Sequence, residues 1–315
     1  MTLENGPEFA VWMMLAGLAA CMVWYGTRLE KYRPAGHTVL LTAVLGSLFA
    51  LVCAKAGYLI HDLGANLLEG TFDEVTALEP ELLSFAGGCA GFTAGTALAA
   101  RLTGIRPMKA LDLFAAPACL FLFLARIAEA GMGELGTGSE AELLRFFPMA
   151  MEDDWGDPCL SVFVLEALWA LVCLIPALRK EPVERDGTVF TRTAVWLLGG
   201  QIGWEMLLQY PFVRTFVTSF VSLEQVICAI LLLVIVIAGC VRTRKWWTLP
   251  VTAALLGASA FFQFYRDNKI GFVLEEGWEW AVDNAVTISR IAFFLISAAL
   301  IRVAGQAITS KKDET

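Results

Sequence analysis

The chain has 315 residues, of which 57% are hydrophobic and only 17% are charged, and its mean hydropathy is +0.65. Soluble domains are about 45–50% apolar and about 25% charged, so this composition excludes an ordinary soluble enzyme, a coiled coil and a disordered chain. The net charge of −8 does not fit a nucleic-acid-binding protein, which needs a basic stripe, and no nucleic-acid partner is expected.

Apolar runs long enough to cross a bilayer recur along the whole sequence, since a spanning helix needs about 17–25 mostly apolar residues. They predict an all-α, polytopic α-helical membrane protein with about nine transmembrane helices. The expected spans are residues 8–27, 38–60, 83–101, 111–131, 159–178, 190–213, 222–241, 246–265 and 284–304.

Lysine and arginine predict the orientation, because cytoplasmic loops of membrane proteins carry an excess of both. With the N-terminus outside, most of the 23 Lys and Arg residues fall in inner segments, including the clusters at 28–33 and 242–245. The expected topology is therefore N-out and C-in. The outer loops 62–81, 134–157 and 267–283 are rich in Asp and Glu, as solvated loop surfaces are.

Cysteine and histidine give no sign of a metal site or a disulfide framework. The eight cysteines form no CxxC pair and nearly all lie in apolar runs, where cysteine acts as a small apolar filler. With only His37 and His61 available, no cluster offers the four ligands of a structural zinc site. No metal and no cofactor is therefore expected.

Charged residues inside expected spans are the strongest functional signal, because such groups are costly in a membrane. Away from the span edges these are Lys55, Arg126, Glu129, Glu166 and Glu205. Arg126 and Glu129 are three residues apart, so they share a helix face and can form an ion pair. A functional site and interhelical hydrogen bonding both remain open as explanations.

Two further patterns occur in other expected spans. Gln201 and Gln209 lie four residues before and after Glu205, which makes a polar stripe on one helix face. Gly87 and Gly88 open a glycine-rich helix start that permits either close helix packing or the close approach of a lipid headgroup, packing being favoured.

Several motifs, in order and at matching spacing, resemble one family. Ser84–Gly91 (SFAGGCAG) resembles the SFHGGLxG element of bacterial prolipoprotein diacylglyceryl transferases, and Asp112–Pro117 resembles the DxxAP stretch of that family. Ala125–Leu135 (ARIAEAGMGEL) is similar to the signature GRxGNFxNGEL. Shorter matches occur at 54–58, 165–168 and 222–226. The resemblance covers about residues 8–242, which implies a seven-helix membrane core at 1–242 and two additional helices at 243–315.

The resemblance implies a function. The family transfers a diacylglyceryl group from phosphatidylglycerol to the lipobox cysteine thiol of a prolipoprotein, at the outer face of the bacterial inner membrane. A phospholipid and a prolipoprotein signal peptide are therefore the expected partners. The expected catalytic residues are Arg126, Glu134 and Glu129, and the expected substrate-binding residues are Gly87, Gly88, Glu166, Glu205, Gln209 and Lys55.

The chain departs from the family pattern at several functional positions. Ala86 stands where the family has a histidine, Glu129 stands at its signature asparagine, and Met13 at a tyrosine of its first helix. In a gapless placement Glu205 and Gln209 replace an arginine and a glutamate. These changes make the site more negative, so a transferase with another headgroup or acceptor, a non-catalytic lipid-binding or scaffolding relative, and a small transporter all remain open.

Overall fold

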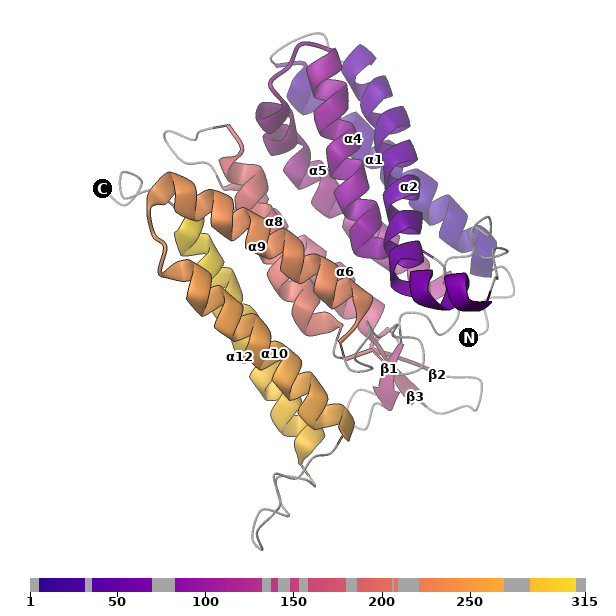
Figure 1. Ribbon diagram of the computed structural model, residues 1–315. Helices are drawn as coiled ribbons and strands as arrows, with labels where there is room; N and C mark the ends of the chain where they lie inside the picture. The colour runs from indigo at the N-terminus through magenta and orange to yellow at the C-terminus, as the bar shows by residue number, and fades with distance from the viewer. Residues whose placement is uncertain are drawn as a thin grey trace, which may run out of the picture. The chain divides into compact units, whose positions relative to one another are not determined.

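The computed structural model describes residues 6–31, 36–69, 83–131, 137–140, 148–152, 158–179, 186–205, 207–208, 221–268 and 284–309. The helices are α1 (Gly6–Leu29), α2 (Gly36–Glu69), α4 (Phe85–Leu102), α5 (Pro107–Ala128), α6 (Val162–Val172), α7 (Leu174–Leu178), α8 (Thr188–Trp204), α9 (Leu223–Thr243), α10 (Thr248–Asn268) and α12 (Ala285–Ile308) (Figure 1). A short 3₁₀ turn, η2 (Glu129–Gly131), continues α5.

The expectation of an all-α polytopic membrane protein is confirmed. Every expected span contains a helix, and six helices in the described part of the chain are long and apolar enough to cross a bilayer: α1, α2, α5, α9, α10 and α12. Their lipid-facing character follows from exposed apolar side chains such as Trp12, Leu40 and Ile230. The count of nine spans and the N-out, C-in orientation stay predictions.

The expected span at 159–178 is wrong in its internal structure. Its first residues belong to the strand β3 (Pro158–Ser161), and the helix that follows is interrupted at Cys173, which separates α6 from α7. β3 pairs antiparallel with both β1 (Thr137–Glu140) and β2 (Ala150–Glu152), in the order β1–β3–β2. This small sheet lies in the chain between α5 and α6.

The chain divides into two compact units, residues 1–193 and 194–315, and the boundary falls inside α8. The sequence predicts a different division, into a core at 1–242 and two additional helices at 243–315. That division stays a prediction.

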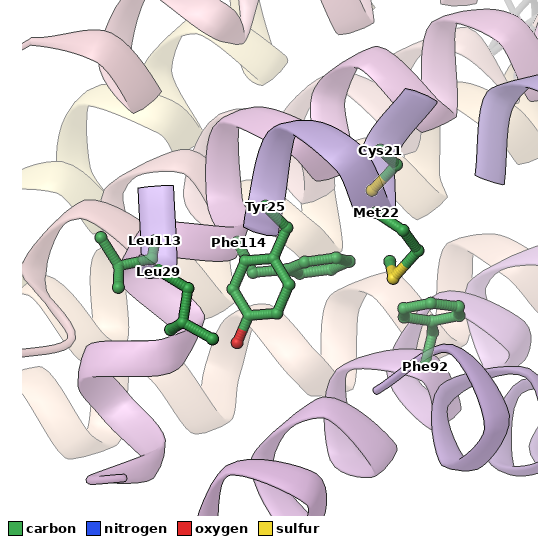
Figure 2. Close-up of a cluster of buried hydrophobic side chains, with 7 residues drawn as sticks. All are labelled: Cys21, Met22, Tyr25, Leu29, Phe92, Leu113 and Phe114. Carbon is green, nitrogen blue, oxygen red and sulfur yellow. The ribbon is translucent and has the colours of Figure 1, made fainter. Parts of the chain in front are cut away.

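An aromatic cluster forms the core of the first unit (Figure 2). The ring of Tyr25 from α1 meets Phe114 of α5 edge-on, with centroids 5.4 Å apart, and Phe92 of α4 stacks on Phe114 at the same separation. Cys21, Met22, Leu29 and Leu113 complete the cluster. Offset and edge-on ring pairs of this kind stabilise a core beyond simple area burial, so α1, α4 and α5 form one packed group.

The most extensive helix contact among the described residues of this unit is between α2 and α4, which run side by side in Figure 1. A methyl group at Gly95 would lie 2.5 Å from the carbonyl oxygen of Leu45, and one at Gly87 would lie 2.7 Å from that of Cys53. A methyl group at Gly91 would collide with the carbonyl of Phe49. Glycine at every fourth position therefore lets the two backbones touch, a common mode of packing in membranes.

This contact gives a first prediction. Gly91→Ala should lower the free energy of unfolding by about 1–3 kcal/mol, because the added methyl group overpacks a contact that leaves no room. Thermal unfolding in detergent micelles, followed by circular dichroism, measures the effect.

Gly257→Ala is the matched control, because a methyl group at Gly257 in α10 meets nothing within 4 Å. It should leave stability unchanged or raise it by up to about 1 kcal/mol through helix propensity. Equal unfolding temperatures for the two variants would contradict the close contact.

Candidate functional site

The site is centred on Arg126, whose buried side chain lies in the last turn of α5. Its Nη1 atom lies 2.5 Å from Oε1 of Glu129 and 3.1 Å from Oε2 of Glu166. The guanidinium carbon lies 3.7 Å from the centre of the Phe85 ring. One cation thus meets two carboxylates and one aromatic face, and burial strengthens all three interactions relative to water.

Local structure explains the position of each carboxylate beside Arg126. Glu129 follows the last residue of α5 and begins the 3₁₀ turn η2. Its spacing of three residues from Arg126 places both side chains on one helix face. The ion pair that the sequence predicts is confirmed. Glu166 comes from α6, which packs against α5. The side chain of Glu129 is 15% exposed and that of Glu166 only 3%, so Glu129 lies at the more open edge of the site.

Phe85 covers the guanidinium because the start of α4 is fixed in place. The buried side chain of Ser84 caps α4 by accepting a hydrogen bond from the backbone N–H of Gly87, at 3.0 Å. The N–H of Ser84 donates in turn to the carbonyl oxygen of Ala54 in α2, also at 3.0 Å. A side-chain cap of this kind satisfies an otherwise unpaired helix N–H, so the turn that carries Phe85 is held by both helices.

Lys55 follows Ala54 in α2 and is buried, with its ammonium 5.0 Å from the centre of the Tyr58 ring. Lys55 therefore belongs to the same end of the unit as the turn that carries Phe85. The structure places Gly87 against the backbone of α2, and a methyl group at Gly88 would make ordinary contact with Ala54 and Ala50. Close packing of α4 against α2 therefore explains why a glycine stands at position 87.

Asp112 has a role that the sequence analysis did not assign. Its buried carboxylate accepts hydrogen bonds from the backbone N–H groups of Gly187, at 2.6 Å, and Phe190, at 2.9 Å. It therefore caps the N-terminus of α8 from a position within α5, where a negative charge is favoured by the helix dipole. Nothing in the local sequence of Asp112 signals this contact, because its partners lie more than seventy residues away.

Of the residues expected to converge, the structure brings together Arg126, Glu129 and Glu166. Glu134 and Gln209 lie outside the described residues, and Glu205 belongs to the second compact unit. A shallow, mostly apolar groove of about 520 Å³ between the end of α1 and the start of α2, lined in part by Met22, contains none of the candidate residues.

Glu205 is the centre of a separate buried polar network. Its carboxylate accepts hydrogen bonds from the side chains of Gln201, at 3.0 Å, and Ser222, at 3.1 Å. Ser222 also caps α9 in a reciprocal capping box with Gln225. The amide of Gln225 donates to Gln263 of α10, at 3.4 Å. The network therefore joins the end of α8 to α9 and α10.

Residue spacing predicts that Gln201, Glu205 and Gln209 form a polar stripe on one helix face. The structure confirms the contact between Gln201 and Glu205, and adds Ser222, Gln225 and Gln263 as partners that spacing along one helix does not reveal.

Comparison with known proteins gives one finding. The sequence model of a family described as prolipoprotein diacylglyceryl transferase matches residues 9–241, which is well over half of the chain. The match includes Arg126, Glu129, Glu166 and Glu205, and it ends before α10 and α12. No curated protein matches the chain.

The Arg126 ion pairs lead to a second prediction. Arg126→Met should lower the free energy of unfolding by about 3–5 kcal/mol, because it takes this cation away from the buried carboxylate of Glu166 and the half-buried carboxylate of Glu129. Adding Glu166→Gln should recover part of this loss, since one uncompensated charge is removed. Equilibrium unfolding of the single and double variants measures the coupling, and additive effects would contradict a shared guanidinium.

The Glu205 network leads to a third prediction. Ser222→Ala should destabilise the protein by about 1–2 kcal/mol, because it removes a helix cap and a donor to a buried carboxylate. Ser297→Ala is the matched control, since the buried hydroxyl of Ser297 has no hydrogen-bond partner among the described residues. Removing this hydroxyl should leave the free energy of unfolding nearly unchanged in the same measurement. An equal loss of stability in the two variants would contradict the role of Ser222 as a helix cap and donor to Glu205.

Proposed function

Because this chain belongs to the prolipoprotein diacylglyceryl transferase family, we propose that it transfers a diacylglyceryl group from a membrane phospholipid to the thiol of a prolipoprotein cysteine. The observation that carries the proposal is the buried Arg126 cluster within the matched region. A fold hosts many activities, so the assignment of this one depends on what the Arg126 cluster can do chemically.

The reaction places two demands on the protein. The thiolate attacks the glycerol carbon that bears the phosphate, a sulfur–carbon bond forms, and the carbon–oxygen bond to the phosphate breaks. The leaving phosphate monoester needs a cation in a medium of low dielectric, because negative charge accumulates on its oxygens. The cysteine must also lose its proton, since the thiolate is the nucleophile.

Arg126 meets the first demand in this proposal. A guanidinium binds phosphate oxygens through paired N–H donors and keeps its charge when buried. Its Nη1 atom contacts both Glu129 and Glu166, and in this proposal the phosphate displaces one of the two carboxylates from that atom. Glu129 is the group that moves, because it lies at the more exposed edge and ends its helix.

Glu129 meets the second demand. A carboxylate released from Arg126 becomes a stronger base, because the neighbouring positive charge no longer favours its ionised form. It can then accept the thiol proton, as a general base within reach of its substrate does. Glu134, five residues further along, is proposed as a second catalytic group at the outer face of the bacterial inner membrane.

The remaining proposed contacts bind substrate. In this proposal Glu166 and Lys55 flank the headgroup, and Gly88 at the start of α4 lies beside the lipid. Gly87 contributes indirectly, because its packing against α2 holds this helix start in place. Glu205 and Gln209 are proposed to contact the acceptor peptide or the lipid. The natural donor of the family, phosphatidylglycerol, is the reference donor for testing these roles.

A non-catalytic, lipid-binding relative is the alternative, and one observation favours it. Arg126 is already neutralised by two carboxylates, and Ala86 offers no imidazole beside it. Such a protein would bind a phospholipid without transferring its diacylglyceryl group.

A transfer assay distinguishes the transferase from the non-catalytic, lipid-binding alternative and gives a fourth prediction. Purified protein in vesicles containing several phospholipids is mixed with a lipobox peptide, and the peptide is followed by mass spectrometry. The peptide should gain one diacylglyceryl unit, and Arg126→Ala should reduce the rate by about 100-fold or more through loss of charge stabilisation.

Arg106→Ala is the matched control, because the side chain of Arg106 is 83% exposed and lies outside the site. It should leave the rate unchanged. Glu129→Gln, which preserves shape, should also abolish transfer while the protein stays folded. No mass gain with folded wild-type protein would support the non-catalytic alternative.

A further inference from the structure

We propose that the turn between α9 and α10, residues 242–247, binds the headgroup phosphate of an anionic phospholipid, with Arg244 as its main contact and the rings of Trp246 and Trp247 beside it. The turn follows the region that the family model matches, and it belongs to the second compact unit, whereas Arg126 belongs to the first. The site is therefore distinct from the Arg126 cluster, and the inference does not depend on transfer activity.

The first argument is the charge of the turn. Residues 242–245 contain two arginines and one lysine, and no Asp or Glu occurs between Gln225 and Arg266. The nearest acids of this helix hairpin stand at its far ends, about 30 Å from the turn at 1.5 Å per helical residue. The tail 310–315 lies outside the described residues, and its two lysines, one aspartate and one glutamate add no net side-chain charge. Cations beside a spanning helix attract anionic lipid headgroups.

The second argument is the backbone of Arg244, which ends α9 in a conformation that glycine favours. Its φ is 62° and its ψ is 18°, and its N–H donates to the carbonyl oxygen of Cys240 at 2.8 Å. Arg244 is the one non-glycine residue with a positive φ in the described part of the chain. Left-handed backbone is disfavoured for a residue with a Cβ atom, and glycine is the usual residue at this position. An arginine here indicates a role for its side chain.

The third argument is that the guanidinium of Arg244 is available to a ligand. Its side chain is exposed and makes no hydrogen bond or ion pair with the described residues. The neighbouring Arg242, by contrast, donates from Nη2 to the carbonyl oxygen of Ile308 in α12, at 2.8 Å. Arg242 thus joins two helices, whereas Arg244 can bind phosphate oxygens through its paired N–H donors.

The backbone of the turn offers no competing anion site. The N–H groups of Thr248 and Leu249, at the start of α10, donate to the carbonyl oxygens of Lys245 and Trp246, at 3.1 and 3.3 Å, and Pro250 has no N–H. The hydroxyl of Thr248 also donates to the carbonyl oxygen of Lys245, at 2.8 Å. These bonds hold the turn in one shape and leave an anion to be bound by side chains.

The fourth argument is the apolar surface beside the cation, which favours a lipid over a soluble phosphate. Trp246 and Trp247 are 47% and 53% exposed, and tryptophan is enriched at the membrane–water interface. Ile237 and Val241 are exposed one turn apart on α9 and lead toward the turn. An acyl chain can lie along this face of α9 while the phosphate of the same lipid meets Arg244.

Quenching of tryptophan fluorescence gives the fifth prediction. The protein is placed in phosphatidylcholine vesicles that contain a fraction of either phosphatidylglycerol or phosphatidylcholine with brominated acyl chains, which quench nearby tryptophans. Subtracting the signal of the double variant Trp246→Phe/Trp247→Phe isolates these two rings. Phosphatidylglycerol should bind beside them at least about 5-fold better than phosphatidylcholine, the preference expected from one cation near a headgroup.

Arg244→Gln should reduce this preference by about 5-fold, because it removes the main phosphate contact. Arg244→Lys should keep most of it, because the charge is retained. Arg101→Gln is the matched control, since it removes an exposed arginine from the end of α4, and it should leave the preference unchanged.

Arg244→Gly separates a binding role from a structural one. In detergent without anionic lipid it should unfold at the same temperature as the wild type or a higher one, because glycine adopts left-handed backbone without a steric cost. It should still bind phosphatidylglycerol about 5-fold more weakly. A lower unfolding temperature with unchanged lipid binding would mean that Arg244 only supports the helix end, and would overturn the proposal.

The other outcomes are equally distinct. Equal quenching by the two brominated lipids in the wild type overturns the anionic site, and an unchanged preference in Arg244→Gln overturns the role of Arg244. Loss of the preference in the presence of an equal concentration of inorganic phosphate overturns the lipid as the ligand. Binding is measured without an acceptor peptide, so none of these results bears on the transferase proposal, and absence of transfer does not bear on this site.

Discussion

A guanidinium shared by two carboxylates is the constraint on which the first unit depends. None of the three groups is stable alone in a protein interior, so Arg126, Glu129 and Glu166 must be brought together or not buried at all. The helices that carry them are therefore fixed in their relative positions: α5 supplies two of the groups and α6 the third. Phe85, from the start of α4, places an aromatic face on the same cation.

The close packing of α2 and α4 serves this arrangement. Gly87, Gly91 and Gly95 remove the side chains that would separate the two backbones, and the hydrogen bond from Ser84 to Ala54 fixes the end of the contact nearest the site. Asp112 acts in the same way at the opposite end of α5, where it holds the start of α8. The family match covers all of these helices, and the cation cluster lies at one end of their packing.

The sequence predicts the features that depend on local spacing. Apolar runs locate every helix of the described residues, the three-residue spacing predicts the pair Arg126–Glu129, and glycine spacing favours close helix packing. It does not predict contacts between distant segments, such as Glu166 with Arg126, Asp112 with α8, or Gln225 with Gln263, because nothing local encodes their partners. The sheet is missed because strands as short as β2 carry too few residues to show alternation.

The hydrogen bond between Gln225 and Gln263 joins the matched region to the segment that follows it. The family match ends at residue 241, so Gln225 lies within the shared core and Gln263 lies beyond it. Thr243 and Arg242 at the end of α9 also donate to backbone carbonyls of Ala307 and Ile308 in α12. These hydrogen bonds tie α10 and α12 to α9 through an interior amide and through helix ends. Removing the segment after residue 247 would therefore take away acceptors that α9 uses inside the matched region and at its end.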